Sequence, residues 1–585
     1  MIIPPFRSEP SLDFSDPRNR TDFQAALRQV EGRLGERYPL LIAGEAVDTE
    51  ESLDSYNPAH PGQVVGRHAM ADPSHVELAL ERGWEAFTRW SRTPVEERAL
   101  ILLRAAELVR RRRHELGALM VYEVGKPGDE ADGEAAEAVD LMEWYARQAM
   151  GLAARDQMTP WPGEATQFRY LPLGVGAVIS PWNFPLALTT GMTTAALVSG
   201  NCVILKSAET ASTTAAWLVE LLHEAGIPKG ALSYLSGRGE VVGEALVDHP
   251  KTRFVAFTGS KEVGIRIYER ASRVHPGQRW LKRVQLEMGG KNAVVVDETA
   301  DLKLAAAEIT RSAFGFQGQK CSAGSRAVLV SSIYDELVPR VLELTRRLRM
   351  GDPVDPEVGL GPVIDGDAEE KILDYLQLGR QEGELLTGGS RADGDGHFIE
   401  PTIFGSVAEG ARIATEEIFG PVLAVVRAKD FEDGLRIANQ TEYGLTGSYF
   451  SRDPERIAHA KDRFHVGNLY INRRSTGAQM GVHPFGGFNM SGTDTKAGGP
   501  DYLLFFVQGQ SVAEKLLALR CRRCAMWWRS TSTPGVSRGG WWWAGCRTSP
   551  AGTCSRRCST SRTIWTTCGC GCCASRAAIR PPTAM

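Results

Sequence analysis

The chain has 585 residues, and its 67 Lys and Arg nearly balance its 71 Asp and Glu, for a formal net charge of −4. So small a charge argues against nucleic-acid or membrane partners, and no stretch approaches the roughly 20 apolar residues of a membrane span. The N-terminus has prolines and acids where a secretory signal needs a basic start and an apolar run, so we expect a cytoplasmic protein.

The hydrophobic pattern changes its period along the chain. Apolar residues recur at intervals of three and four through 95–123 and 134–149, which predicts long helices. Further on, short β-rich runs such as 175–180 and 202–206 alternate with helical patterns, which predicts a parallel sheet covered on both faces. A second alternating series runs over 292–472. We therefore expect an α/β fold with two sheet domains and a ligand site where they join.

A segment framed by prolines follows the first of these strands. Pro181 and Pro185 hold the backbone around Asn183 outside helix and sheet. A side-chain amide fixed at such a strand end can donate a hydrogen bond to a developing oxyanion. The alternative is a proline-framed turn in which Asn183 caps the following helix.

Two other strand ends carry residues suited to a dinucleotide. Lys206 ends a strand and Glu209 follows it, so the pair can hold ribose hydroxyls, and Glu209 would repel a 2′-phosphate, which favours NAD over NADP. Gly259 and Ser260 open a helix, where backbone donors can bind a pyrophosphate. The alternatives are a surface ion pair and an ordinary serine N-cap. The glycines within 237–243 have the wrong spacing for a dinucleotide fingerprint.

Cys321 is one of only two cysteines in the first 520 residues. Its neighbours Gly318, Lys320 and Ser322 suit a nucleophile, because backbone dipoles and a nearby cation favour a thiolate. The alternative is a buried cysteine that packs as a small hydrophobic side chain.

Glu287 is followed by Gly289 and Gly290, which would let its carboxylate swing as a general base that gives way to a cofactor. The alternative is a solvated surface charge. No histidine or serine pattern suggests a metal site or a hydrolase triad, so we expect no metal.

Together and in this order, these segments resemble the aldehyde dehydrogenase superfamily. The resemblance covers roughly residues 35–517 and rests on SPWNFP, LKSAET, FTGS, LEMGGKN, GQKCSA, EEIFGP and PFGGF. It implies that the Cys321 thiolate attacks an aldehyde, that the Asn183 amide and the cysteine N–H hold the oxyanion, and that Glu287 activates water. It also implies NAD as the cofactor, bound by Ser180, Pro181, Trp182, Lys206, Glu209, Gly259, Ser260, Glu417 and Phe419.

A closer resemblance is to the branch of this family that oxidises L-glutamate γ-semialdehyde, the open form of Δ1-pyrroline-5-carboxylate, in proline breakdown. It rests on FQGQKCSA, FHVGNLYINR and the residues before VHPFGGF. It implies that Ser322, Gly477 and Ala478 anchor the substrate's α-carboxylate and amine, while Phe184 and Phe485 enclose its aliphatic stem. The alternatives are another small aldehyde, such as succinate semialdehyde, and a non-catalytic binding protein.

The resemblance implies two doubly wound parallel-sheet domains and a small β element through which copies of the chain associate. We expect a homo-oligomer, a dimer or higher. The expected parts are an N-terminal extension at 1–36, an NAD-binding domain at 37–152 and 171–286, a catalytic domain at 287–483, and an oligomerisation element at 153–170 and 484–517.

The composition changes abruptly at residue 518. Residues 518–585 contain no Asp, Glu or Lys but 11 Arg and nine of the 11 Cys. With few aliphatic residues and no apolar period, this tail is expected to be disordered, and its composition is typical of a GC-rich gene read out of frame. The alternatives are a zinc site built from cysteines such as Cys521 and Cys524, and an arginine-rich segment that binds RNA.

Overall fold

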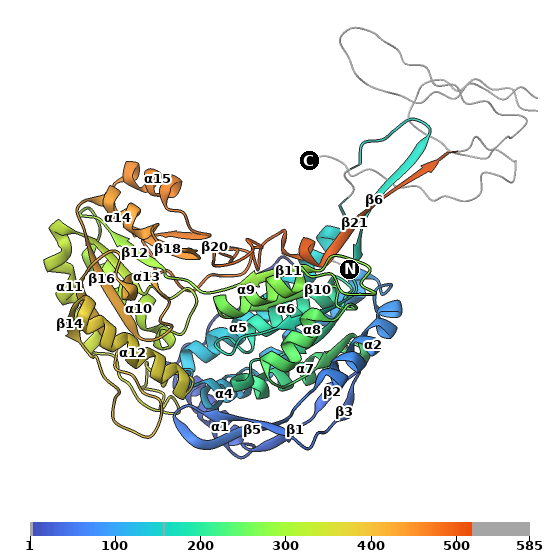
Figure 1. Ribbon diagram of the computed structural model, residues 1–585, viewed down its shortest axis with the longest axis horizontal. Helices are drawn as coiled ribbons and strands as arrows, with labels where there is room; N and C mark the ends of the chain where they lie inside the picture. The colour runs from blue at the N-terminus through green and yellow to red at the C-terminus, as the bar shows by residue number, and fades with distance from the viewer. Residues whose placement is uncertain (1–3, 156–157, 517–585) are drawn as a thin grey trace, which may run out of the picture. The chain divides into compact units, whose positions relative to one another are not determined.

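The computed structural model describes residues 4–155 and 158–516, and Figure 1 shows how its helices and strands are arranged. The tail predicted at 518–585 lies outside the described residues. The described residues divide into two compact units, one of residues 4–155 and 168–511 and one of residues 158–167 and 512–516. The larger unit contains both of the expected sheets.

The N-terminal part of the larger unit is a helix followed by a small sheet. Helix α1 (Pro17–Glu31) begins after Asp16, whose side chain accepts a hydrogen bond from the Arg18 N–H. A three-stranded sheet has the order β1-β5-β4. Its strands are β1 (Glu36–Tyr38), β4 (Ser52–Asn57) and β5 (His60–Ala69).

The first seven-stranded sheet has the order β11-β10-β7-β8-β9-β2-β3. Strands β7 (Val175–Ile179) and β8 (Cys202–Lys206) are buried along their whole length, as is typical of parallel strands covered on both faces. The remaining strands are β2 (Leu40–Ile42), β3 (Glu45–Val47), β9 (Leu232–Tyr234), β10 (Phe254–Thr258) and β11 (Arg283–Glu287). Because β2 and β3 are antiparallel, the sheet is parallel only over its other five strands.

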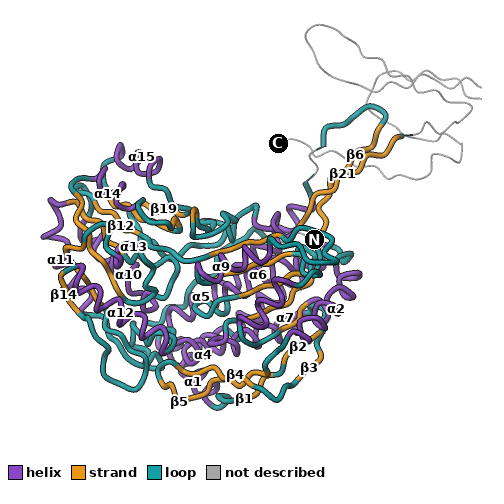
Figure 2. The backbone as a smooth tube through the Cα atoms, in the orientation of Figure 1, coloured by secondary structure: helices purple, strands orange, loops and turns teal. Residues whose placement is uncertain are grey.

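Helices pack around this sheet (Figure 2). They are α2 (Pro73–Trp90), α3 (Val95–Arg111), α4 (Arg113–Val124), α5 (Gly128–Ala153), α6 (Ala187–Val198), α7 (Ser212–Ala225), α8 (Glu244–Asp248) and α9 (Lys261–Ala271). The single helix predicted over 95–123 is wrong, because Arg112 leaves helical geometry with φ −102° and ψ 16°. The break turns Arg113 inward, where its side chain pairs with Asp132.

The second seven-stranded sheet has the order β14-β15-β16-β13-β12-β18-β19. Its strands are β12 (Ala293–Val296), β13 (Arg326–Val330), β14 (Glu384–Thr387), β15 (Thr402–Val407), β16 (Val422–Ala428), β18 (Thr446–Phe450) and β19 (Asn468–Ile471). Only β14 is antiparallel to its neighbour. The α/β fold with two largely parallel sheets is therefore confirmed.

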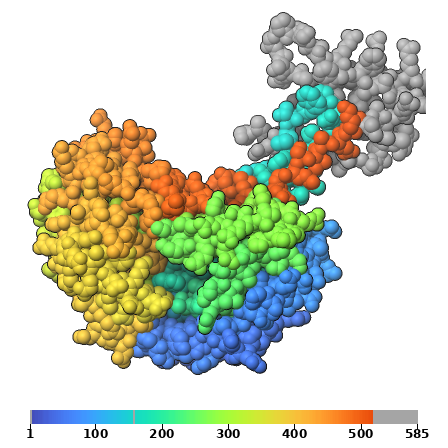
Figure 3. Space-filling view, in the orientation of Figure 1, coloured from blue at the N-terminus to red at the C-terminus, as the bar shows by residue number. Residues whose placement is uncertain are grey.

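Six helices accompany this sheet in the described chain: α10 (Leu302–Phe314), α11 (Ser331–Arg346), α12 (Gly366–Glu382), α13 (Arg412–Thr415), α14 (Phe431–Ala438) and α15 (Pro454–Arg463). In the space-filling view, yellow and orange residues of this part fill a region of their own beside the blue and green residues of the first sheet (Figure 3). The two sheets thus organise separate cores within the larger unit.

Two short strand pairs complete the described structure. Strands β6 (Glu164–Pro172) and β21 (Val507–Lys515) pair with each other, and so do β17 (Tyr443–Gly444) and β20 (Phe488–Asn489). Across residues 4–155 and 158–516, none of the helices is both long and apolar enough to cross a membrane.

Candidate active site

The Asn183 amide lies against the segment that carries Cys321. Asn183 follows β7 and is 5% exposed, and its Nδ2 donates to the Gln319 carbonyl over 3.0 Å. The alternative that Asn183 caps the next helix is wrong, because α6 begins after Leu186 without a side-chain cap of its own. Instead the Glu134 carboxylate accepts the N–H groups of Leu186 and Ala187. The amide is therefore fixed beside the nucleophile segment.

Cys321 follows a strained turn and is half-buried. Phe316 and Gln317 have positive φ values of 49° and 56°, and they belong to the short 3₁₀ turn η4 (Gly315–Gly318). The Cys321 carbonyl accepts a hydrogen bond from Asn292 Nδ2 over 2.7 Å. The turn and this bond hold the cysteine backbone in one place.

The charges around Cys321 disfavour a thiolate, whereas the sequence led us to expect that they favour one. Burial and the carboxylates of Glu287 and Glu417 raise the pKa of the Cys321 thiol to about 12. The expectation that the neighbouring cation favours a thiolate is wrong, because the Lys320 ammonium pairs with both Glu130 oxygens at 2.7 Å. The resting thiol is therefore protonated.

Glu287 ends β11 as a buried and unpaired carboxylate. Its side chain is 7% exposed, and neither oxygen has a hydrogen-bond partner among the residues described. Burial raises the pKa of Glu287 well above its usual range, while the charge of Lys496 opposes the rise. Glu287 is thus no solvated surface charge, and an orphaned carboxylate in such a place is poised to accept a proton.

Lys206 and Glu209 gather at the carboxyl end of β8. Lys206 is 4% exposed, and burial lowers its pKa against the attraction of Glu209. Glu209 Oε1 accepts the Gly239 N–H over 2.9 Å. The glycine segment 237–243 therefore contacts Glu209, although its spacing does not match a dinucleotide fingerprint. The comparison with that fingerprint alone missed this contact.

Gly259 and Ser260 lie where β10 meets α9. The Gly259 N–H donates to the Glu287 carbonyl over 3.0 Å, and a Cβ on Gly259 would overlap the Phe257 ring. Ser260 is the N-cap of α9, since its Oγ accepts the Val263 N–H over 3.3 Å. The serine is an ordinary cap at a helix N-terminus that still offers backbone donors.

Glu417 and Phe419, which the family resemblance assigns to the nicotinamide end of the cofactor, contact residues of other segments. Glu417 Oε1 accepts the Gly290 N–H over 2.8 Å, and a Cβ on Gly289 would overlap that carboxylate. Phe419 takes a positive φ of 62°, and its ring meets the edge of Trp182 with centroids 5.6 Å apart. The polar and aromatic groups expected to surround the cofactor thus contact one another.

Ser180 and Pro181 line the same end of β7. Both are buried, the Ser180 N–H donates to the Lys206 carbonyl over 3.0 Å, and the Ser180 hydroxyl has no partner within the described chain. A buried hydroxyl without a partner at this strand end fits a ribose or phosphate oxygen.

The residues expected to bind substrate surround the Cys321 segment. The Ser322 carbonyl accepts a hydrogen bond from Ser475 Oγ over 2.9 Å. Gly477 is exposed with φ 75°, a conformation that favours glycine, and Ala478 is half-buried next to it. The Arg473 guanidinium donates to the Gly477 carbonyl over 2.8 Å, which helps to hold the turn in place.

The two aromatic residues assigned to the substrate stem come from distant segments. Phe184 is half-buried, and its ring meets the edge of Phe316 at 6.4 Å. Phe485 is half-buried and exchanges two backbone hydrogen bonds with Ala497, at 2.8 and 2.7 Å. The Phe184 ring thus has an aromatic partner and the Phe485 backbone is held in place, and the joint grip of the two rings on a substrate stays a prediction.

Sequence reasoning missed Glu137 on α5. Burial and the neighbouring Glu134 raise the pKa of Glu137 to about 7, and the Glu137 charge in turn raises the pKa of Cys321. Glu130, Glu134 and Glu137 are spaced by four and three, which places them on one face of a helix. That spacing is the signal that could have found them.

Comparisons with known proteins agree with this geometry. The model of the aldehyde dehydrogenase family matches residues 46–512. A 1-pyrroline-5-carboxylate dehydrogenase of Geobacillus sp. (strain WCH70) is 55% identical over 513 residues, which is 88% of this chain and 100% of the relative. The one from Bacillus cytotoxicus is 52% identical over 515 residues, again 88% of this chain and 100% of the relative. A Thermus 1-pyrroline-5-carboxylate dehydrogenase solved with bound NAD is 50% identical, with a TM-score of 0.87 over 88% of this chain and 100% of that one.

Proposed function

The chain belongs to the aldehyde dehydrogenase family, and we propose that it oxidises L-glutamate γ-semialdehyde, formed from Δ1-pyrroline-5-carboxylate, to L-glutamate with NAD. The observation that carries the proposal is a fixed Asn183 amide against the segment of Cys321, a free thiol whose pKa is raised by burial and by the buried, unpartnered carboxylate of Glu287. The full-length similarity to 1-pyrroline-5-carboxylate dehydrogenases supports the substrate.

Acylation begins at Cys321. Once the thiol has released its proton to solvent, the sulfur attacks the aldehyde carbon, and the Asn183 amide together with the cysteine N–H holds the oxyanion of the thiohemiacetal. Bound NAD would supply the acceptor for the hydride that leaves this carbon, which would leave a thioester on Cys321. Because donors such as the Asn183 amide are fixed before the reaction, they need no reorganisation as charge develops.

Deacylation is the work of Glu287. Its carboxylate removes a proton from the water that attacks the thioester, which releases the acid and restores the thiol. Only the ionised carboxylate can accept that proton. The charge of Lys496 favours this form against burial, so the pair sets how much of the base is ready at neutral pH.

The cofactor fits residues contributed by both sheets. Lys206 and Glu209 would hold the adenosine ribose, Ser180 would approach the same nucleotide, and Glu417 would hold the nicotinamide ribose. The buried Ser180 hydroxyl without a partner supports a polar ligand at this place.

Substrate selection rests on the turn after Arg473 and on α5. The N–H groups of Gly477 and Ala478 would bind the α-carboxylate, and Ser322 would assist them. We assign the α-ammonium to Glu137, whose charge adds to burial in raising the pKa of the Cys321 thiol. A cation would favour the ionised form of Glu137 and would also offset its negative charge. That charge would then no longer raise the pKa of the Cys321 thiol.

The test is NADH formation by the purified chain with Δ1-pyrroline-5-carboxylate and with succinate semialdehyde. We expect a strong preference for the former in kcat/KM, because succinate semialdehyde lacks the α-ammonium and carries its carboxylate elsewhere. Cys321→Ala is the matched control and should lose turnover while it still binds NAD. Equal or reversed rates would move the substrate to another small aldehyde.

We also propose that copies of the chain associate through the β6–β21 pair and that the protein acts in the cytoplasm. Both strands are largely exposed along their length, and Trp161, close to β6, is 66% exposed. Exposed paired strands offer free edges to another copy. Sedimentation of the chain, compared with a variant that carries proline in β21, tests the assembly.

A further inference from the structure

A buried ion pair next to the site has no part in the chemistry described above. Lys126, in the loop between α4 and α5, pairs with Glu134 on α5, and the two side chains are 1% and 0% exposed. Removing such a pair from water is costly, and it repays this cost only when further hydrogen bonds satisfy both groups. The groups that these further hydrogen bonds reach therefore indicate the role of the pair.

The Lys126 ammonium reaches the catalytic amide's own residue. It donates to the Asn183 carbonyl over 2.8 Å. It also lies over two aromatic rings, 4.1 Å from the centroid of Phe184 and 4.3 Å from that of Phe316. One cation thus contacts the oxyanion donor, a substrate-facing ring and the strained turn before the nucleophile.

The Glu134 carboxylate holds the other end of the same segment. Its Oε1 accepts the N–H groups of Leu186 and Ala187, over 2.8 and 3.0 Å, where α6 begins. A carboxylate is favourable at a helix N-terminus. The pair therefore binds residues 183–187 at both ends.

The Lys126 loop is also joined to the nucleophile segment by a second contact. Gln317 Nε2 donates to the Gly125 carbonyl over 3.0 Å and to the Pro362 carbonyl over 2.7 Å. Gln317 is one of the two residues with positive φ in the turn before Cys321. The loop thus contacts both segments that must meet for acylation.

We infer that Lys126 and Glu134 are positioning residues that fix Asn183 and Phe184 against the Cys321 segment, and so set the geometry in which the thiohemiacetal forms. The inference rests on the proposed function. It gives two glutamates of α5 different roles. Glu134 holds residues 186 and 187, while Glu137 would bind the α-ammonium of the substrate.

The double variant Lys126→Met with Glu134→Gln tests the inference. It removes both charges together, and the amide oxygen of the substituted side chain can still accept the N–H groups of α6. We expect kcat to fall about a hundred-fold, the loss typical of a small displacement of reacting groups, and KM for the aldehyde to rise. The Kd for NAD should not change, because the contacts of Lys206 and Glu209 are untouched. Lys126→Arg keeps the charge, so its kcat should fall less than that of the double variant.

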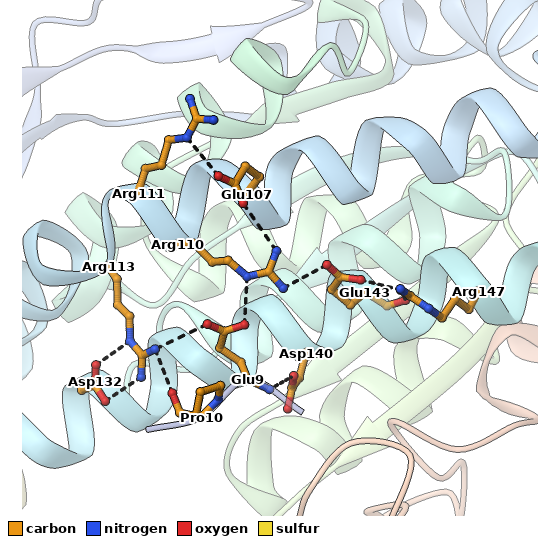
Figure 4. Close-up of polar contacts among 10 residues, drawn as sticks. All are labelled: Glu9, Pro10, Glu107, Arg110, Arg111, Arg113, Asp132, Asp140, Glu143 and Arg147. Carbon is orange, nitrogen blue, oxygen red and sulfur yellow. Dashed lines mark hydrogen bonds and ion pairs between the residues drawn. The ribbon is translucent and has the colours of Figure 1, made fainter. Parts of the chain in front are cut away.

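A matched control lies on the same helix. Arg113 and Asp132 form another buried pair, 8% and 2% exposed, between α4 and α5, and they contact the N-terminal segment through Pro10 instead of the site (Figure 4). Arg113→Met with Asp132→Asn should lower Tm and leave kcat unchanged.

Three results would each refute either the positioning role or the proposed function. Wild-type kcat in the folded Lys126 and Glu134 double variant, or an equal loss of kcat in the control, refutes the positioning role. A wild-type chain that forms no NADH refutes the proposed function itself.

Discussion

At residue scale, the proposed role of Glu287 as the base predicts that the charge around it decides when the thioester can be hydrolysed. Burial keeps the Glu287 pKa well above its usual range and Lys496 opposes this. A base with a raised pKa is protonated at low pH and becomes active as pH rises through that pKa. Lys496→Met removes the cation, so the Glu287 pKa should rise further and the acidic limb of the kcat profile should move to higher pH.

This shift is measured as kcat against pH for the wild type and the Lys496 variant. Lys496→Arg keeps the charge and should leave the limb in place. Glu287→Gln should form NADH in one burst and then stall, because acylation needs only Cys321 and Asn183. An acidic limb that stays fixed in Lys496→Met would show that another group controls deacylation.

Motifs at this scale were readable because each role needs a particular residue type. An amide at 183, a thiol at 321 and a carboxylate at 287 were all predicted from the sequence, and the structure buries the amide and the carboxylate and leaves the thiol half-buried. The pKa of Cys321 was not predictable, because Lys320 is neutralised by Glu130, 190 positions away. Charge balance depends on which distant residues the fold brings together.

At the scale of elements, α4 and α5 are tied to the N-terminal segment by a network of ion pairs (Figure 4). Asp132 accepts two hydrogen bonds from Arg113 and one from the Leu12 N–H. Asp132→Asn leaves the Arg113 charge buried without its partner, which should lower the free energy of unfolding by about 3–5 kcal/mol. Urea denaturation followed by circular dichroism measures the change.

The control for this prediction is Glu107→Gln in the same network. Glu107 is 49% exposed and pairs with Arg111 at 3.1 Å, so its loss should cost at most about 1 kcal/mol. Similar effects of the two substitutions would contradict the claim that burial gives Asp132 its importance.

Helices and strands were predictable to different degrees. Alternating strands and helices predicted both sheets, because burial on two faces leaves long apolar runs such as 202–206. The break at Arg112 was not predictable, since the apolar period continues across it. The antiparallel pairing of β2 with β3 and β9, and of β14 with β15, was equally hidden, because side-chain alternation carries no record of strand direction.

At the scale of the whole molecule, the residues assigned to chemistry all precede Leu517. Curated relatives are matched over their full length by 88% of this chain. A chain truncated after Leu517 should therefore keep the kcat/KM of the full chain, as NADH assays of the two proteins would show. The same truncation with Cys321→Ala gives the background rate.

A truncated chain that folds but has lost its activity would show that residues 518–585 contribute to function. Sequencing the gene across the Leu517 codon tests the frameshift hypothesis separately. An uninterrupted reading frame without error would contradict it. The expected domain boundaries stay predictions at this scale, because the contacts divide the chain only into the larger unit and the smaller one.

The carboxylates around Cys321 also affect how readily its thiol is oxidised when no substrate is bound. Peroxide and disulfides attack thiolates, and a thiol whose pKa is raised to about 12 offers almost none at neutral pH. We therefore expect the raised pKa to slow oxidative inactivation of the free enzyme. In the proposed mechanism the sulfur attacks as a thiolate, so turnover would also expose it to these oxidants.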